Sequence, residues 1–325
     1  MADIAMHNTM ANDLYKRFDQ AMQSKIDGAY MRLGSQGPDP YFYRIFKARK
    51  KTMHIGERLH EENMNKTLQT MITYVKTQQT PQNLGFLLGY IAHFTLDTIL
   101  HPYVYYHVGL YQYNNPKTHP LRGLHLRFER NIDAHFLKQR YNVMPHKIKL
   151  YQEALINKPL DQSVKKLLDD TLKNVHNLEA GGKRYEKSLR TMRLVLKYGI
   201  FDRFGLKKRL YGFVDFFQRK RDLYFKDLSF YNYDQSYDYL NLTKTCWHHP
   251  ITNQRCCDDV LTLYKQALKR AFELIKAVYD HIVHHRPLSV SQLFENRSMN
   301  TGLDCKDQSP MKYFNIYTGI RLEKF

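Results

Sequence analysis

Apolar residues recur at helical spacing along most of the chain. This pattern predicts helices at residues 8–24, 54–78, 82–101, 121–140, 161–178, 181–199, 206–222 and 258–285. The sequence shows no strand-like alternation of useful length and no repeat of fixed period. We therefore predict an all-α, multi-helix fold in a single domain that spans residues 1–325.

The segments between these helices differ in character. Glycines and prolines in GSQGPDPYFYR (34–44) predict a loop with a definite shape. Residues 226–256 are rich in Tyr and Asn and we expect them to be irregular, and the segment after Pro287 shows little pattern. Residues 1–140 thus form one half of the domain, with the polar motifs described next, and residues 141–325 add helices and an irregular C-terminal segment.

The apolar stretch LGFLLGYIAHFTLDTIL (84–100) is nearly long enough to cross a membrane. Asp97 near its centre would oppose insertion by roughly 2.5–3.5 kcal/mol, and His93 would add to that cost. Pro81 and Pro102 bracket the stretch. We therefore predict a buried helix of about five turns rather than a membrane span.

Three titratable residues interrupt this apolar helix. His93, Asp97 and His101 follow one another at intervals of four residues, so they form one stripe with neighbours about 5–6 Å apart. Burying such groups is costly unless they are paired or bound. A single histidine of this kind is often a core residue satisfied by a hydrogen bond. Gly89 lies on the same stripe and would admit another backbone or an ion.

A second helix repeats the spacing. HLRFERNID places His125, Glu129 and Asp133 at the same intervals, so two facing helices can bring six polar side chains together. Imidazole nitrogens and carboxylate oxygens are the ligands that zinc takes where thiolates are absent. Two such stripes favour a metal site between helices over isolated core histidines. Asp39, between two prolines, either presents its carboxylate outward from a stiff loop or is a simple turn aspartate.

The charge of the chain is unusually positive. The formal net charge is +19, of which +5 falls in residues 1–135 and +14 in the remainder. Such an excess favours phosphate-bearing partners, either nucleic acid or an anionic membrane, although a solvated surface is the plainer alternative. The basic run RIFKARKK (44–51) could contact headgroup phosphates or simply be solvated. Residues 196–221 are basic and amphipathic, so they could rest on a membrane or face the core.

The cysteines and the N-terminus bear on the cellular compartment. The four cysteines form no C-x-x-C pair, which argues against a thiolate zinc site and a redox motif. Cys256 and Cys257 are adjacent, and we expect reduced thiols rather than a disulfide framework. The N-terminal sequence shows no basic region followed by an apolar stretch, as a secretory signal would. From these features we expect a cytoplasmic protein.

Four motifs occur in an order that resembles a known family. GSQGPDPYFY, GERLH, GYIAHFTLDTILHPYVYY and HLRFERNID, in that order, resemble the bacterial zinc-dependent phospholipase C family over about residues 1–140. The back half matches more loosely, as helical bulk with a segment near Trp247. The resemblance implies an all-helical fold with a metal site between helices, bound zinc, and cleavage of phospholipids to diacylglycerol and a phosphorylated head group.

The resemblance also assigns ligands by position. One zinc would be held by Asp39, His60, His93 and Asp97. A second would be held by His101, His125 and Glu129. His7 would belong to a third, with Asp97 as the bridge, and Asp133 would orient a ligand histidine. His60 is preferred to His54, the alternative, because the family's G-x-x-x-H pattern occurs here as GERLH.

Two departures affect this assignment. Secreted members of the family complete the third site with a processed N-terminal Trp, whereas this chain starts MADIAMH, so two zinc ions are expected and the third stays open. The step from the aspartate to the next histidine is four residues here, D-T-I-L-H, and six in the secreted enzymes. Four residues keep His101 on the helical stripe, so we expect metal binding to survive.

Three functions are compatible with these features. The favoured one is a zinc-dependent phosphodiesterase that hydrolyses a glycerophospholipid with metal-activated water, which Asp39 would orient or deprotonate. The second is a nuclease for single strands with the same metal architecture, which the positive charge and the 14% aromatic content would suit. The third is a non-enzymatic basic helical protein that binds nucleic acid or a membrane. Phospholipid, with transient membrane contact, is the expected partner and nucleic acid is less favoured; head-group preference and oligomeric state stay open.

Overall fold

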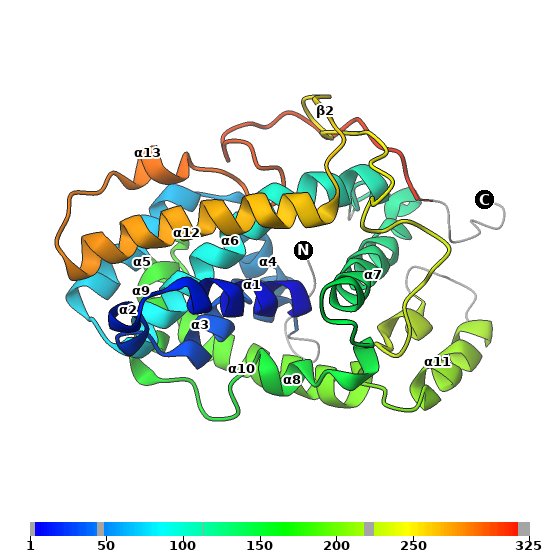
Figure 1. The fold of residues 1–325 in the computed structure, drawn as a ribbon, viewed down its shortest axis with the longest axis horizontal. Helices are drawn as coiled ribbons and strands as arrows, with labels where there is room; N and C mark the ends of the chain where they lie inside the picture. Colours follow the sequence, from blue (N-terminus) through cyan, green and yellow to red (C-terminus); the bar gives the residue numbers. More distant parts are fainter. Residues whose placement is uncertain (1–3, 44–48, 113, 218–223, 318–325) are drawn as a thin grey trace.

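The computed structural model describes residues 4–43, 49–112, 114–217 and 224–317, without the side chains of residues 49–54. Its α-helices are α1 (Ile4–Arg17), α2 (Gln20–Ser24), α3 (Gly28–Gly34), α4 (Arg49–Glu61), α5 (Met64–Thr77), α6 (Pro81–Val108), α7 (Leu121–Tyr141), α8 (Leu150–Glu153), α9 (Gln162–His176), α10 (Gly181–Leu194), α11 (Leu206–Phe217), α12 (Val260–Val283) and α13 (Val290–Phe294). Short helical turns are η1 (Asp39–Tyr43), η2 (Pro116–Thr118), η3 (Pro145–Lys147), the π turn η4 (Val195–Ile200) and η5 (Phe225–Leu228). In the described residues the only strands are β1 (Trp247–His248) and β2 (Arg255–Cys256), so the all-α prediction is confirmed (Figure 1).

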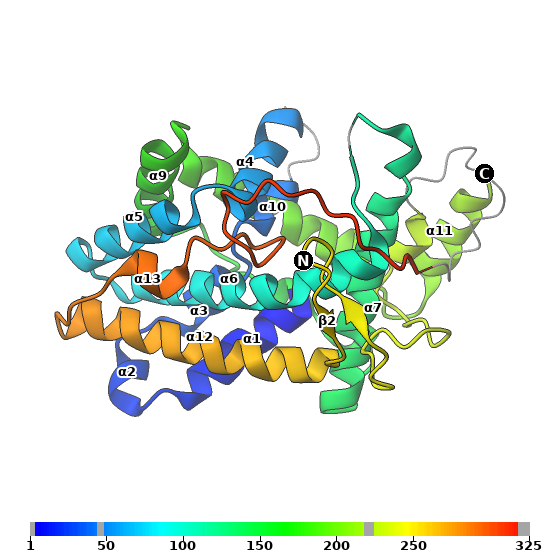
Figure 2. The ribbon, with the colours of Figure 1, turned by 90° about the horizontal axis from the view of Figure 1, so that it is seen from above.

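Helix α6 runs through the middle of the molecule and packs against α3, α12, α7 and α1 (Figure 2). Among the described helices it alone is long and apolar enough to cross a membrane, but 94% of its apolar stretch is buried inside the fold. This burial is that of a core helix, as the sequence predicts. Because α12 comes from the back half of the chain, both halves contribute to the core around α6.

Glycines bring α3 and α6 into direct backbone contact. A Cβ atom on Gly89 would lie 2.2 Å from the carbonyl oxygen of Met31, and one on Gly85 would lie 2.4 Å from that of Asp27. Neither position has room for a larger residue. The space beside Gly89 is therefore filled by another backbone and not by an ion. This close packing sets the loop after α3 against the polar stripe of α6.

Pro102 does not end α6, contrary to the prediction from sequence. The helix continues to Val108 and is followed by Gly109, whose φ is 72°. Pro102 removes one backbone donor, and the carbonyl of Thr98, which would have accepted from it, lies against Gly302. Continuing the helix buries further apolar side chains, which offsets the lost hydrogen bond.

Two of the predicted helices are each divided in two. The 8–24 helix is interrupted because Asp19 caps a new helix, accepting a hydrogen bond from the Met22 N–H at 2.7 Å. The 54–78 helix is interrupted at Asn63, whose φ of 53° is left-handed. Helices α3, α8 and α13 were not predicted, since they are short and depend on tertiary packing.

Some predicted features lie outside the described residues. They include the side chains of the basic run 44–51 and the side chain of His54. The part of the predicted 206–222 helix after Phe217 also lies outside them.

The 226–256 segment, predicted to be irregular, ends in a small hairpin that a disulfide closes. Strands β1 and β2 pair Trp247 with Cys256, so Cys246 and Cys257 lie opposite each other one step further along and form a disulfide. The expectation of reduced thiols at this place is therefore wrong. The adjacency of Cys256 and Cys257 in the sequence does not indicate how β1 and β2 pair. The register of this pairing determines which cysteine lies opposite Cys246. Cys256 and Cys305 are free thiols and are half-buried.

Helix α11 lies at one end of the molecule, apart from the core helices (Figure 1). Most of its large apolar side chains are exposed. Of the two alternatives for residues 196–221, packing of the apolar face against the core is therefore wrong for α11.

Candidate metal centre

The polar stripe of α6 points into the interior of the protein. His93, Asp97 and His101 are all buried, with at most 1% of each residue exposed. Histidines and carboxylates from α1, η1, α4 and α7 converge on this stripe. Three groups of such side chains have ligand atoms close enough together to hold one metal ion each.

The first group is formed by Asp39, His60 and His93, beside Asp97. The Nε2 atom of His60 lies 3.3 Å from Oδ1 of Asp39, and that of His93 lies 3.0 Å from Oδ2 of Asp97. The Nε2 of His60 is also 3.7 Å from the same Asp97 oxygen. The structure thus brings together the four residues predicted for one zinc. The prolines around Asp39 place it at the start of η1, aimed inward rather than outward.

The second group is formed by His101, His125 and Glu129. Oε1 of Glu129 lies 2.8 Å from Nε2 of His125 and 3.8 Å from that of His101. The His125 side chain is 23% exposed, whereas the other two are nearly inaccessible. This group is therefore the part of the centre closest to solvent.

The third group joins His7, from α1, to Asp97 and His93. Nε2 of His7 lies 3.1 Å from Oδ1 of Asp97, and the His7 ring stacks on that of His93 with centroids 4.2 Å apart. The same Oδ1 is 3.8 Å from Nε2 of His101. Asp97 therefore turns one oxygen toward the first group and the other toward His7 and His101, as a bridging carboxylate would. Residues 1–3, which precede α1, lie outside the described part of the chain.

Backbone carbonyls fix the orientation of three of these histidines. The Nδ1 atoms of His60, His93 and His101 lie 2.7, 3.0 and 2.6 Å from carbonyl oxygens. A carbonyl only accepts, so each Nδ1 carries the proton and donates it. In the neutral ring the Nε2 lone pair then faces the centre. The three acceptors belong to Gly56, Ser35 and Met299, respectively.

The inward-facing atoms have no hydrogen-bond partner among the described residues. They are both oxygens of Asp97, Oδ1 of Asp39, and the Nε2 atoms of His7, His60, His93 and His101. Lone pairs facing one another in a buried site cost several kcal/mol unless a cation lies between them. Nitrogen and carboxylate donors without thiolate are a normal zinc ligand set. The residues present therefore fit bound zinc.

The protonation of the centre follows from its burial and its carboxylates. Burial lowers the pKa of His7, and lowers those of His101 and His125 well below the usual value. Burial also opposes charge on His60, but Asp39 and Asp97 outweigh it and raise the pKa of His60 to about 9. Without a metal, His60 is thus the ring that holds a proton at neutral pH.

Asp133 supports the centre by holding the start of helix α1. Its Oδ2 accepts from the Ala5 N–H at 2.7 Å and its Oδ1 from the Met6 N–H at 3.1 Å. A carboxylate there satisfies free amides at the start of α1 and suits the positive end of the helix dipole. Through these contacts Asp133 positions the helix turn that carries His7, and the role of orienting a ligand histidine stays a prediction.

The C-terminal segment supports the centre through contacts that the sequence does not indicate. The Met299 carbonyl accepts from His101, and the Met299 N–H donates to the His60 carbonyl at 2.8 Å. Ser298 also donates to the His60 carbonyl, at 3.3 Å. These contacts are made mainly by backbone groups. Because every residue type offers a backbone carbonyl, the sequence cannot indicate such contacts. The sequence does not indicate the role of Gly37 either: with φ of 48°, it allows the His93 ring to lie against the backbone.

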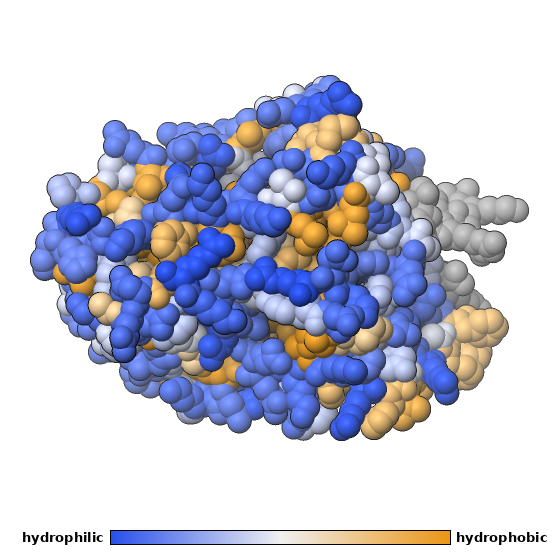
Figure 3. Space-filling model, viewed as in Figure 1, coloured by the Kyte–Doolittle hydropathy of each residue, from blue (hydrophilic) through white to orange (hydrophobic). Residues whose placement is uncertain are grey.

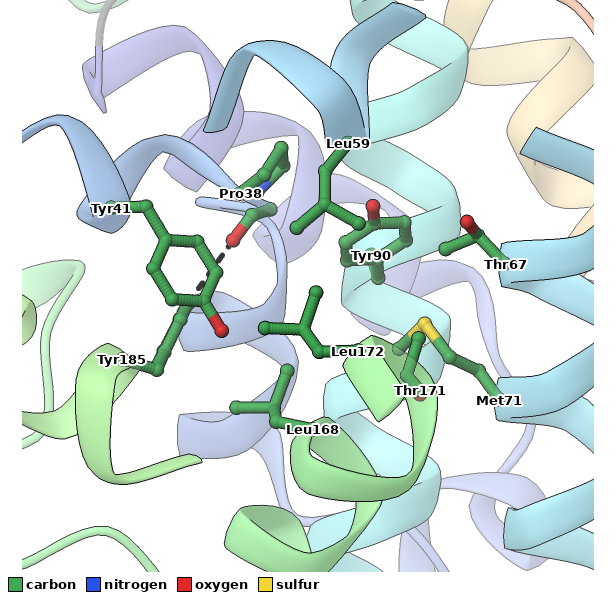
Figure 4. Close-up of a pocket in the computed structure, with 11 residues that line it drawn as sticks. Pro38, Tyr41, Leu59, Thr67, Met71, Tyr90, Leu168, Thr171, Leu172 and Tyr185 are labelled. Carbon is green, nitrogen blue, oxygen red and sulfur yellow. Dashed lines mark hydrogen bonds between the residues drawn. The ribbon is translucent and has the colours of Figure 1, made fainter. Parts of the chain in front are cut away.

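A small cavity lies behind the metal centre, between η1, α5, α6 and α9 (Figure 4). Its volume is about 10 Å³, and the Tyr90 hydroxyl and Thr67 Oγ1 beside it have no hydrogen-bond partner in the described part of the chain. Burial, with the nearby carboxylates of Asp39 and Asp97, raises the pKa of Tyr90. Such a space suits one water molecule at most. This cavity therefore has no space for a larger ligand, and His125, with 23% of its side chain exposed, is the most accessible of the residues in the three groups.

Comparison with known proteins agrees with this geometry. A family model described as zinc-dependent phospholipase C matches residues 6–178, slightly more than half of the chain. The matched range includes all eight predicted ligands and extends beyond the 1–140 region of the four motifs. No curated protein and no solved structure matches the chain.

Proposed function

This chain belongs to the zinc-dependent phospholipase C family, and from that membership we propose that it hydrolyses the phosphodiester bond of a glycerophospholipid at a multinuclear zinc site. The observation that carries the proposal is that the two carboxylate oxygens of Asp97 face two different groups of ligands. Its Oδ2 faces His93 at 3.0 Å and its Oδ1 faces His7 at 3.1 Å. A carboxylate shared in this way supports adjacent metal ions rather than a single structural one.

The donor set supports two zinc ions with room for a third. Asp39, His60, His93 and Asp97 would hold one, and His101, His125 and Glu129 a second. His7 with Asp97 would contribute to another. Held by these residues, zinc would supply Lewis-acid chemistry for a phosphoryl oxygen and for a water nucleophile at neutral pH.

The side chains of the centre have separate tasks in this proposal. The Nδ1 contacts to Gly56, Ser35 and Met299 hold three imidazoles in one tautomer, so no ring has to reorient when substrate arrives. Asp39 comes from a short loop and borders the first group, which suits it to orient an attacking water and accept its proton. The partly exposed His125 side admits the phosphate.

Zinc content and hydrolysis, measured together, test the proposal. The purified protein is expected to contain two or three zinc ions per chain and to release a phosphorylated head group from phosphatidylcholine. A strong chelator should abolish this activity and added zinc should restore it. Less than one zinc per chain, with hydrolysis indifferent to chelator, would contradict the proposal. Faster cleavage of single-stranded DNA in a parallel assay would favour a nuclease with the same centre.

A further inference from the structure

Helix α11 carries an apolar stripe that faces solvent. Leu206, Leu210, Phe213 and Phe217 follow the i, i+4, i+7, i+11 spacing of one helix face, and each is between 60% and 65% exposed. Phe216, next to the stripe, is 77% exposed. On a helix of a soluble domain this is the face that normally packs on the core. The orientation of α11 is therefore the reverse of the usual one.

Polar contacts hold α11 in this orientation. The buried carboxylate of Asp215 accepts hydrogen bonds from the N–H groups of Phe225 and Lys226 at 2.7 and 2.9 Å. The Lys208 N–H donates to Oδ2 of Asp202 at 2.9 Å, and this carboxylate also accepts from Ser229. These hydrogen bonds fix the polar side of α11 to the rest of the protein. The apolar stripe on the opposite side therefore faces solvent.

The exposed apolar surface extends beyond the helix itself. Phe204, just before α11, and Leu194 and Tyr198, around the end of α10, are also exposed. Figure 3 shows apolar surface gathered at the end of the molecule where α11 lies. An apolar surface of this extent marks a place of contact with another apolar phase or partner.

Cations surround this surface. Lys197, Arg203 and Arg209 are exposed. The Lys197 ammonium lies 4.8 Å from the centre of the Tyr198 ring, and the Arg203 guanidinium 5.4 Å from that of Phe204. Aromatic rings paired with Lys and Arg are typical of protein segments at a membrane interface.

A basic pocket adjoins the same helix on its protein-facing side. It measures about 260 Å³ and lies between α7, the start of α11 and the η5 region. Its charged lining is Arg127, Arg130, Lys208 and Lys226 against Asp227 and Asp234, an excess of two positive charges. Arg127 is paired with Asp234 at 3.1 Å and Arg130 donates to the Leu228 carbonyl, so the pocket contributes positive charge beside α11 rather than a free phosphate site.

We propose that α11 is an interfacial anchor that inserts its apolar stripe into an anionic phospholipid bilayer, with Lys197, Arg203 and Arg209 against the lipid phosphates. Charge complementarity selects this occupant. A second copy of the chain on the same surface would bring Lys197, Arg203 and Arg209 against their own equivalents, which opposes self-association. The anchor lies outside residues 6–178, so it is a feature of the part of this chain beyond the family match.

Vesicle flotation tests the anchor directly. The full chain is mixed with vesicles of 30% phosphatidylglycerol in phosphatidylcholine, and with pure phosphatidylcholine vesicles. Tight binding is expected only to the first. The variant L210S/F213S/F217S should partition at least about 100-fold less, because each buried Leu or Phe contributes roughly tenfold. The matched control Y141S/L242S changes exposed apolar residues elsewhere and should bind like the wild type.

A second variant and a second readout separate the alternatives. K197E/R203E/R209E should lose the preference for phosphatidylglycerol. Circular dichroism should show that all variants remain folded, as expected for exposed positions. Unchanged vesicle binding by both variants would overturn the anchor. It would also be overturned if the wild type does not bind vesicles but forms a dimer, and L210S/F213S/F217S is a monomer.

The relation to catalysis depends on the proposed function, and the assay keeps the two apart. On a short-chain phosphatidylcholine below its micelle concentration, the serine variant should hydrolyse substrate at the wild-type rate, whereas on vesicles it should be slow. If the wild type hydrolyses neither substrate but floats with anionic vesicles in an α11-dependent way, the proposed function fails and the anchor stands.

Discussion

His93 and Asp97, one turn apart on α6, point Nε2 and Oδ2 at each other across 3.0 Å. Nδ1 of His93 already donates to the Ser35 carbonyl, so in a neutral ring the atom facing the carboxylate is a lone pair. A buried lone pair and a buried carboxylate repel each other unless a cation or a proton lies between them. The arrangement is stable with metal bound and poorly satisfied without it.

Replacing Asp97 by asparagine should empty the centre. The amide is isosteric, but it removes the charge shared by His7, His93 and His101. We expect a loss of zinc affinity larger than the roughly 10–100-fold that loss of an outer partner costs. Plasma spectrometry of D97N should find less than one zinc per chain. The control D307N, at an exposed aspartate, should keep wild-type zinc, and full zinc in D97N would disprove the bridging role.

Zinc affinity should rise with pH between 7 and 9. The carboxylates of Asp39 and Asp97 overcome burial and raise the pKa of His60 to about 9, so zinc must displace a proton at pH 7. His7 and His101 have lowered pKa values and are already neutral there. The apparent Kd should therefore fall by up to about tenfold per pH unit and level off above pH 9. Competition titrations with a chelator measure Kd, and calorimetry in two buffers counts the released proton. A flat profile from pH 7 to 9 would show that His60 is not a ligand.

Gly89→Ala should weaken both the fold and the centre. Its Cβ atom would sit 2.2 Å from the Met31 carbonyl oxygen and 2.7 Å from the Ser35 nitrogen, so α3 and α6 must separate. We expect a loss of about 1–3 kcal/mol in the free energy of unfolding, with lower zinc affinity as the Ser35 carbonyl shifts from His93. Gly212→Ala is the matched control, because that position has open space around it. It should stabilise the protein by about 0.5–1 kcal/mol. Equal denaturation midpoints for the two variants would refute the backbone clash.

The protein should lose stability as pH falls from 6.5 to 4 because of His107. Burial lowers the pKa of His107 to about 4, and its Nδ1 forms a hydrogen bond with the Tyr237 hydroxyl at 2.9 Å. Between those pH values His107 binds a proton in the unfolded chain but stays neutral in the folded chain. The free energy of unfolding therefore falls by up to about 3 kcal/mol as the pH is lowered. Urea unfolding at several pH values measures this slope. His107→Asn, which keeps an acceptor, should make the slope shallower by the share of one proton, because other buried histidines also have lowered pKa values. H284N, at an exposed histidine, should leave the slope as it is, and an unchanged slope in H107N would exclude a contribution from His107.

The metal ligands on α6 and α7 were predictable because their geometry is local. Intervals of four residues place His93, Asp97 and His101 on one stripe whatever the helix packs against. The order of the motifs added His7, Asp39 and His60 through family resemblance. The helical class followed equally from a pattern repeated over the whole chain.

What the sequence could not predict depends on contacts between distant backbone atoms. The Met299 carbonyl reaches His101 from 198 residues away, and any residue type would offer the same carbonyl. Pro102 was expected to end α6 because the burial of apolar side chains beyond it, which offsets the lost hydrogen bond, depends on tertiary packing. Helix α11 shows the same limit in another form: its pattern indicates an apolar face but not what covers it.

Reduction of the Cys246–Cys257 disulfide should destabilise the protein. The crosslink spans 11 residues, for which chain entropy predicts about 3 kcal/mol. Protein purified without reductant should show two reactive thiols after denaturation, from Cys256 and Cys305, and four after reduction. C246S/C257S should unfold at lower denaturant concentration, whereas C305S should not show the disulfide-dependent loss. Four thiols before reduction would contradict the crosslink.

Because reducing cytosol keeps such pairs as thiols, the oxidation state in cells also tests the cytoplasmic expectation: a persistent disulfide would place the protein in an oxidising compartment.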